Sequence, residues 1–234
     1  MLRKKSQAEK TLDFDLLKKR FLLEIDYLTT YLNTLDSLKP KITSQLEDKA
    51  YNKTLENPED ESLIHDMYES EYKIINSYQY HSQLTLVYSI YESTLSDLCI
   101  QFQKETNTKL LLINIKGTGI SETCLEYLRL VSSFKKESLS AFWPKLNNYR
   151  LIRNRIAHQN SIFSGITEEE IEIDKQKFIK LIELLQKDRF EITNRSFFIV
   201  NNQVNHDFID IIKSVIEIII SHLENETFLI EQET

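Results

Sequence analysis

The sequence predicts an all-α protein. Only 3 glycines and 3 prolines occur in 234 residues, fewer than the turns of a β-protein of this length require. Hydrophobic residues make up 41% of the chain and aromatic residues 10%, which is enough for a substantial core. These residues recur at helical spacing through most of the chain, so helices are expected to form that core.

The first third of the chain predicts one helix, then a polar boundary. Apolar residues recur at helical spacing over residues 13–38, and Pro40 is expected to end this helix. Residues 49–61 are polar and acidic and contain Asn57-Pro58, which favours a loop or a domain boundary. We therefore expect an N-terminal helical extension, residues 1–75, followed by the main helical domain, residues 76–234.

The middle of the chain contains the strongest helical pattern. Another helix is expected from about residue 62, and residues 81–103 place a wide apolar face on a helix; its members are Leu84, Val87, Tyr88, Tyr91, Leu95, Leu98, Cys99 and Phe102. Residues 109–115 form a short apolar run, which favours either a short strand or an extended loop. Ser121 is the expected N-cap of a helix over residues 122–134.

The last third predicts three helices and a hairpin. Trp143-Pro144 opens a helix that continues to about residue 159. Thr167 and Glu170 have the spacing of a capping box for a helix that ends near residue 187. Residues 190–193 and 196–200 are rich in β-formers and predict a small hairpin, and a final helix is expected over 205–223.

The charge distribution allows only local contact with nucleic acid. The net charge is −7, so the chain has no general basic surface. A window from Lys135 to Arg155 nevertheless holds six basic residues and one acidic residue. The acidic residues 168–174 lie where the dipole of the predicted helix favours negative charge, so we interpret them as helix-stabilising residues and not as a metal site.

The remaining composition indicates a cytoplasmic protein. Cys99 and Cys124 lie in apolar helical patterns, typical of small buried side chains in a reducing compartment, with a disulfide as the alternative. Met1–Lys10 is polar and basic, and no apolar signal-peptide core follows it. Residues 211–220 are the most apolar late stretch, but they are too short and too charged to span a bilayer.

The segment Arg153-Asn154-Arg155-Ile156-Ala157-His158 carries the candidate chemistry. At about 100° per residue, Asn154 and His158 share one helix face, whereas Arg153 lies about 140° from His158. An imidazole can exchange a proton with a ribose 2′-hydroxyl, and a guanidinium can hold the phosphate. Arg153 needs its long side chain, a frayed helix end or a second copy of the chain to reach the same phosphate as His158.

This segment resembles the HEPN superfamily, whose motif is Arg-Asn-x-x-x-His. Arg153, Asn154 and His158 match it at the four-residue spacing. Three further elements look like those of bacterial HEPN groups; they are Tyr88 to Glu92, Gly117-Thr-Gly119-Ile120 with Tyr127-Leu128, and Trp143. The resemblance covers about residues 80–225. A tyrosine follows the histidine by two residues in one common subgroup, but this chain has Asn160 there.

The resemblance implies an up-and-down bundle of four to five helices that forms a homodimer, with the motif helices meeting across the twofold axis. It further implies a metal-independent endoribonuclease acting on RNA without a cofactor, of the kind found in toxin–antitoxin and antiviral defence systems. An antitoxin or regulatory protein is then a further expected partner. The alternative is a non-catalytic HEPN scaffold that binds a protein or RNA.

Four further residues are candidates for supporting roles. Glu92 can orient His158 or Arg153 as a carboxylate behind the site, or simply pair helices. Arg150, Arg155 and Lys145 are candidate RNA contacts, with solvated positions on a helix surface as the alternative. No set of histidines and cysteines has the spacing of a zinc site.

Overall fold

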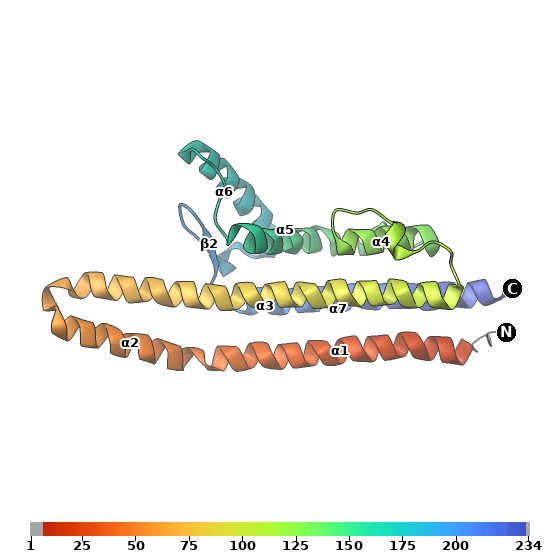
Figure 1. Ribbon diagram of the computed structural model, residues 1–234, viewed down its shortest axis with the longest axis horizontal. Coiled ribbons are helices and arrows are strands. Elements are labelled where there is room, and N and C mark those ends of the chain that lie inside the picture. The colour runs from red at the N-terminus through yellow and green to blue at the C-terminus, as the bar shows by residue number, and fades with distance from the viewer. Residues whose placement is uncertain (1–6, 233–234) are drawn as a thin grey trace. The chain divides into compact units, whose positions relative to one another are not determined.

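The computed structural model describes the backbone of residues 7–232 and the side chains of residues 14–229, and it has an all-α fold (Figure 1). The described range contains seven α-helices, which are α1 (Gln7–Ser37), α2 (Lys39–Glu56), α3 (Glu61–Thr106), α4 (Ile120–Val131), α5 (Trp143–Gln159), α6 (Glu168–Ile182) and α7 (Gln203–Gln232). Strands β1 (Phe190–Ile192) and β2 (Phe197–Ile199) form one antiparallel hairpin. The predicted fold class and the hairpin near the C-terminus are confirmed.

The chain divides into two compact units. The first unit comprises Met1–Tyr27, Val87–Leu146 and Phe208–Thr234, and the second comprises Leu28–Leu86 and Asn147–Asp207. Helices α1, α3, α5 and α7 each contribute to both units. The predicted domain boundary near residue 75 falls inside α3, and the first six residues of Met1–Lys10 lie outside the described range.

The predicted loop over residues 49–61 is wrong. Helix α2 continues to Glu56, and only Asn57 and a 3₁₀ turn, Pro58–Asp60, separate it from α3. Pro40 lies in the first turn of α2, just after α1 ends at Ser37. Leu46 and Ala50 are one turn apart and buried. The helix therefore packs through one narrow apolar stripe, and its other residues are so polar that the sequence is similar to that of a loop.

The first unit is built around the apolar face of α3. Every residue predicted for that face is buried, and all of them except Leu84 belong to this unit. Tyr88 of α3 stacks on Phe208 of α7 with ring centroids 5.8 Å apart. Ser121 is not the N-cap of α4, because Gly119 has that position and Ser121 is buried against the Tyr88 hydroxyl at 3.0 Å. Residues 109–115 form an extended loop with one 3₁₀ turn, so the strand alternative is wrong.

Both cysteines are free thiols in the core of the first unit, as predicted. Cys99 of α3 is 0% exposed and Cys124 of α4 is 1% exposed. The Cys99 thiol donates a hydrogen bond to the Cys124 carbonyl oxygen at 3.6 Å. Hydrogen bonding with the Cys124 side chain and burial raise the pKa of Cys99, so that thiol stays protonated.

An aromatic cluster forms the centre of the second unit. Phe197 of β2 is 0% exposed and stacks on Phe178 of α6 with centroids 4.1 Å apart. Phe163 and Phe190 complete the cluster, at 6.3 Å and 6.4 Å from Phe197. A two-stranded hairpin is marginal alone, and here its inner face is covered by this cluster.

Helix α6 begins as the sequence predicts and ends earlier. The Thr167 hydroxyl accepts from the Glu170 amide at 3.2 Å, and the Glu170 carboxylate accepts from the Thr167 amide at 3.1 Å, so the capping box is confirmed. The helix ends at Ile182, followed by a 3₁₀ turn and by Gln186 with φ 61°. That left-handed residue stops the helix before the predicted residue 187.

None of the helices in the described range combines the length and the apolar character that crossing a bilayer requires.

Candidate functional site

The second half of α5 carries the candidate motif in the second unit. Its inner face holds Tyr149 and Ile152, which are 1% and 0% exposed. The Tyr149 hydroxyl donates to the Val204 carbonyl at 3.2 Å, which fastens α5 to the start of α7. This anchoring leaves Asn154 and His158 on the opposite, polar side of α5, as the helical spacing predicts.

His158 is exposed and lines a cleft between α5 and α6. The cleft has a volume of about 620 Å³, within the usual range for ligand sites of about 300–1,000 Å³. Asn154 lines it one turn before His158. At the far side, Asn148 of α5 donates to the Leu181 carbonyl of α6 at 2.7 Å, which satisfies one of the last carbonyls of α6 and ties the two helices together.

Arg153 does not line this cleft, in agreement with its angular distance from His158. Its side chain is half-buried, and one guanidinium nitrogen donates to the Asn154 side-chain oxygen at 3.0 Å. Asn154 therefore contacts Arg153 and lines the cleft wall together with His158. The structure brings Asn154 together with each of the other two motif residues, but it does not place the Arg153 guanidinium beside the His158 imidazole.

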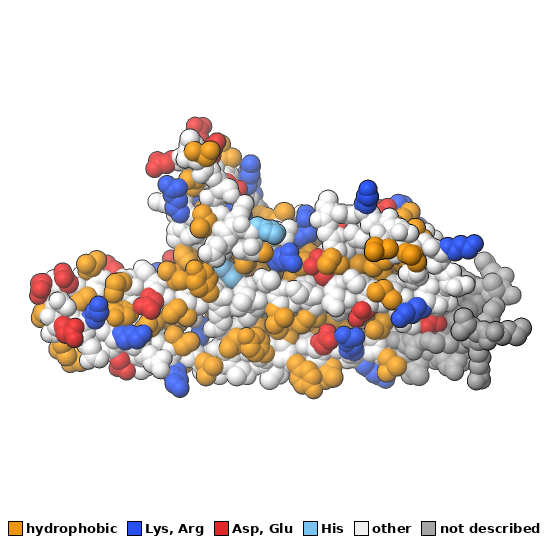
Figure 2. Space-filling view, viewed as in Figure 1, with side chains coloured by type: hydrophobic (Ala, Val, Ile, Leu, Met, Phe, Trp, Pro, Cys, Tyr) orange, Lys and Arg blue, Asp and Glu red, His pale blue; other side chains and the backbone are white. Residues whose placement is uncertain are grey.

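The cleft lining is basic although the chain is acidic. It contains Arg155, Lys177 and Lys180 as well as His158, and none of its residues is aspartate or glutamate. Figure 2 shows charged side chains of both signs on α6, with the acidic ones gathered at one end. Those at the helix start, Glu168 to Glu170, stabilise the dipole of α6 and lie outside the cleft lining.

Arg155 has a carboxylate partner within the second unit. It forms a two-point ion pair with Asp174 of α6, with one nitrogen–oxygen distance of 2.8 Å. Asp174 also accepts from the Ser164 amide at 2.8 Å. The hydrogen bond from Arg155 lowers the pKa of Asp174, so the carboxylate is charged at neutral pH. Arg155 therefore has a structural role, and its contact with RNA stays a prediction.

We expect Asp174→Asn to lower the free energy of unfolding by about 2 kcal/mol, because it leaves the half-buried Arg155 without a counter-charge. Urea denaturation at pH 7 measures this. Asp66→Asn is the matched control, since Asp66 is exposed on α3; its effect should stay within about 0.5 kcal/mol. Equal free energies of unfolding for the two variants would show that the Arg155–Asp174 pair does not contribute to stability.

The chain turns sharply after α5 and is held there by a buried histidine. Asn160 and Ser161 have φ values of 48° and 64°, a conformation that asparagine tolerates. His81 of α3 is 5% exposed and contacts the Ser161 hydroxyl through Nδ1 at 3.1 Å and the Ser77 hydroxyl through Nε2 at 3.1 Å. Ser161 also accepts from the Phe197 amide at 3.1 Å, so the segment after His158 is tied to α3 and β2.

We expect the buried His81, which contacts Ser161 and Ser77, to make the stability of the fold decrease in acid. Burial lowers its pKa to about 4 from 6.5. The unfolded chain therefore binds more protons between these values, and stability falls as the pH drops through that window. When the pH falls from 7.5 to 5, the free energy of unfolding of the wild type should decrease by about 2 kcal/mol more than that of His81→Gln. Urea denaturation at several pH values measures the difference. Parallel pH profiles of the two proteins would contradict this role.

The other predicted residues are spread over both units. Arg150 is half-buried in the second unit and donates to the Asn147 side-chain oxygen at 2.9 Å. Lys145 is exposed and belongs to the first unit, as does Glu92, which is half-buried on α3. The basic window from Lys135 to Arg155 is therefore divided between the units. The supporting roles proposed for Arg150, Lys145 and Glu92 stay predictions.

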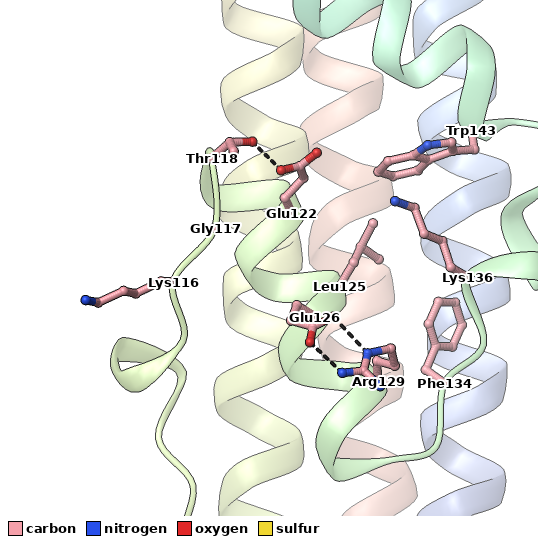
Figure 3. A pocket seen from close by; sticks show the side chains of 10 residues that line it. All are labelled: Lys116, Gly117, Thr118, Glu122, Leu125, Glu126, Arg129, Phe134, Lys136 and Trp143. Atoms are coloured by element: carbon pink, nitrogen blue, oxygen red, sulfur yellow. Dashed lines mark hydrogen bonds and ion pairs between the residues drawn. The ribbon is translucent and has the colours of Figure 1, made fainter.

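A second hollow, of about 450 Å³, lies in the first unit (Figure 3). Four of its five charged side chains have a partner within the hollow, and Glu122 accepts a hydrogen bond from the Thr118 hydroxyl. Arg129 of α4 forms a two-point ion pair with Glu126, and Lys136 lies 3.7 Å from the centre of the Trp143 ring. The lining contains no histidine. We therefore regard the α5–α6 cleft as the better candidate for acid–base chemistry.

The surroundings of the cleft contain two features that sequence reasoning did not identify. Lys177 and Lys180 are three residues apart within a helix that was correctly predicted, so their common face was readable in the sequence. The anchoring role of His81 had no such signal, because its partner Ser161 is 80 residues away.

Within the described residues, no group of three or more histidine, cysteine, aspartate or glutamate side chains is placed to hold a metal ion. Comparison of the chain with protein-family models, with curated proteins and with solved structures gives no match.

Proposed function

We propose that the chain is a metal-independent endoribonuclease of the HEPN kind, with His158, Arg153 and Asn154 at its centre. The observation that carries the proposal is the exposed His158, which lies with Asn154 in a cleft lined by basic residues and no carboxylate. Such a lining attracts a phosphate diester. An imidazole in it is accessible to the 2′-hydroxyl of a bound ribose.

The proposed reaction is an internal transfer at phosphorus. His158 takes the proton of the 2′-hydroxyl, the 2′-oxygen bonds to phosphorus, and the bond from phosphorus to the 5′-oxygen breaks. The imidazolium formed at His158 returns a proton to that leaving oxygen, which gives a 2′,3′-cyclic phosphate and a 5′-hydroxyl. Arg153 offsets the charge on the phosphoryl oxygens, and Asn154, which accepts a hydrogen bond from Arg153, aligns it with the cleft.

Two copies of the chain complete this site in the proposal. Arg153 lies outside the cleft that His158 lines, so one chain supports only part of the reaction geometry. A homodimer in which the α5 helices pair places Arg153 of one copy near His158 of the other. A toxin or antiphage effector with an antitoxin or regulator as partner is the biological role that fits such an enzyme.

The test is cleavage of total RNA by the purified protein in EDTA, followed by analysis of the product ends. Cleavage that leaves 2′,3′-cyclic phosphates supports the proposal. Intact RNA, together with normal growth of a bacterial host that expresses the wild type, would contradict it. Cleavage that stops in EDTA would contradict the metal-independent mechanism.

The second candidate is a non-catalytic scaffold, and one observation favours it. Leu16, Leu23 and Tyr27 of α1 are 53%, 51% and 67% exposed and lie on one side of the helix. Exposed apolar side chains at such spacing are typical of a helix that binds another protein. Under this alternative, alanine at Arg153 or His158 would change neither host growth nor RNA integrity.

A further inference from the structure

Helix α6 forms one wall of the cleft and carries two lysines that face it. Lys177 and Lys180 are three residues apart, so they lie on one side of α6, and both are exposed. Lys177 is close enough to Asp174 to help lower the pKa of that carboxyl, and both lysines also border a hollow that contains Glu169 and Glu172. Neither lysine forms an ion pair with a residue that the structure describes, whereas Lys175 on the same helix pairs with Glu172 at 3.2 Å. The two ammonium groups are therefore available to an anion in the cleft.

Apolar side chains lie next to these charges. Leu151 of α5 is 38% exposed and Leu184, just after α6, is 55% exposed, and both line the cleft. The lysines can contact the phosphates of a nucleic acid, and the exposed leucines can pack against base faces that a single strand leaves unstacked. Duplex RNA offers phosphates and sugars but keeps its base faces stacked inside the helix.

We propose that the α5–α6 cleft binds single-stranded RNA, with Lys177 and Lys180 contacting the phosphates that flank the one at His158. This inference rests on the proposed function and adds to it the strandedness of the substrate and two backbone contacts. Binding by these lysines is independent of base sequence, because an ammonium group on a phosphate does not distinguish the bases.

The experiment measures binding apart from cleavage. The His158→Ala protein is titrated into a fluorescent single-stranded RNA of about 12 nucleotides, a length within the range that single-strand-binding grooves cover, and anisotropy is followed at several salt concentrations. The same titration is made with a variant of this protein that also carries Lys177→Ala and Lys180→Ala. In the matched control, the His158→Ala protein instead carries Lys41→Ala and Lys49→Ala, which remove the same charge from exposed positions on α2. Circular dichroism verifies the fold of each protein.

Loss of the two cleft lysines should weaken binding roughly tenfold at low salt and reduce the slope of log affinity against log salt by about 1.4, since each phosphate contact on a single strand contributes about 0.7. The α2 control should match the parent, and arginine at both positions should restore binding. Duplex RNA of the same length should bind more weakly than the single strand.

Equal affinity and slope in the cleft variant and the α2 control would overturn the inference, as would tighter binding of the duplex or no binding of RNA by the parent. The outcome is distinguishable from that of the proposed function. If wild-type protein cleaves RNA but the lysines have no effect, only this inference fails. If the lysines govern binding but wild-type protein leaves RNA intact, the inference stands and the proposed enzyme does not.

Discussion

Replacing His158 by alanine is expected to lower the rate of RNA cleavage by about 10²- to 10⁴-fold, the usual contribution of general acid–base catalysis. The change removes the proton acceptor of the cleft but leaves its other lining residues in place. Because His158 is exposed, the fold should be unaffected, and the free energy of unfolding should change by less than about 0.5 kcal/mol.

Single-turnover cleavage of a labelled RNA measures this effect, and host growth on expression gives a second readout. His65→Ala is the matched control, since His65 is also an exposed histidine of the second unit and lies on α3. Retention of full activity in His158→Ala would show that RNA is not cleaved in this cleft. A loss of activity in both variants would mean that the assay reports something other than the proposed site.

Replacing Phe197 by alanine is expected to lower the free energy of unfolding by about 3–5 kcal/mol, the largest effect on stability that we predict. The ring is 0% exposed and contacts Phe178 of α6, and it lies 5.6 Å from the His81 ring. Its loss therefore opens a cavity where α6, the hairpin and α3 meet. A typical domain has only about 5–15 kcal/mol of stability, so this loss is severe.

Urea and thermal denaturation followed by circular dichroism measure the loss. Phe228→Ala on α7 is the control, because Phe228 is 42% exposed and its truncation should cost less than about 1 kcal/mol. A cost below about 1 kcal/mol for Phe197→Ala would contradict the central position of the aromatic cluster in the second unit.

The sequence predicts elements well where a periodic apolar face or a local signal marks them. The face of α3, the capping box of Thr167 and Glu170, and the hairpin strands all depend on residues close in the chain, and the structure contains each of them. Helix α2 lacks such a signal, because Leu46 and Ala50 are its only buried residues over its whole length, which is too weak a pattern among polar residues. Ser121 was misplaced because its partner, the Tyr88 hydroxyl, is 33 residues away.

The candidate site follows the same rule. That Asn154 and His158 share a face could be predicted from helix geometry alone, since four residues make about one turn. That Arg155 is held by Asp174 could not, because the pair joins two helices whose packing depends on the aromatic cluster around Phe197. The basic character of the cleft likewise arises only when α6 brings Lys177 and Lys180 beside α5.

The two buried thiols of the first unit allow the rate at which that unit opens to be measured. A maleimide or aromatic disulfide reagent reacts with thiolate only when Cys99 or Cys124 reaches solvent, and both are shielded in the folded chain. The labelling rate in dilute buffer thus reports how often that unit opens. Phe197 belongs to the second unit. If Phe197→Ala labels faster than the wild type, the two units unfold cooperatively, and if the labelling rates are equal, the units unfold separately.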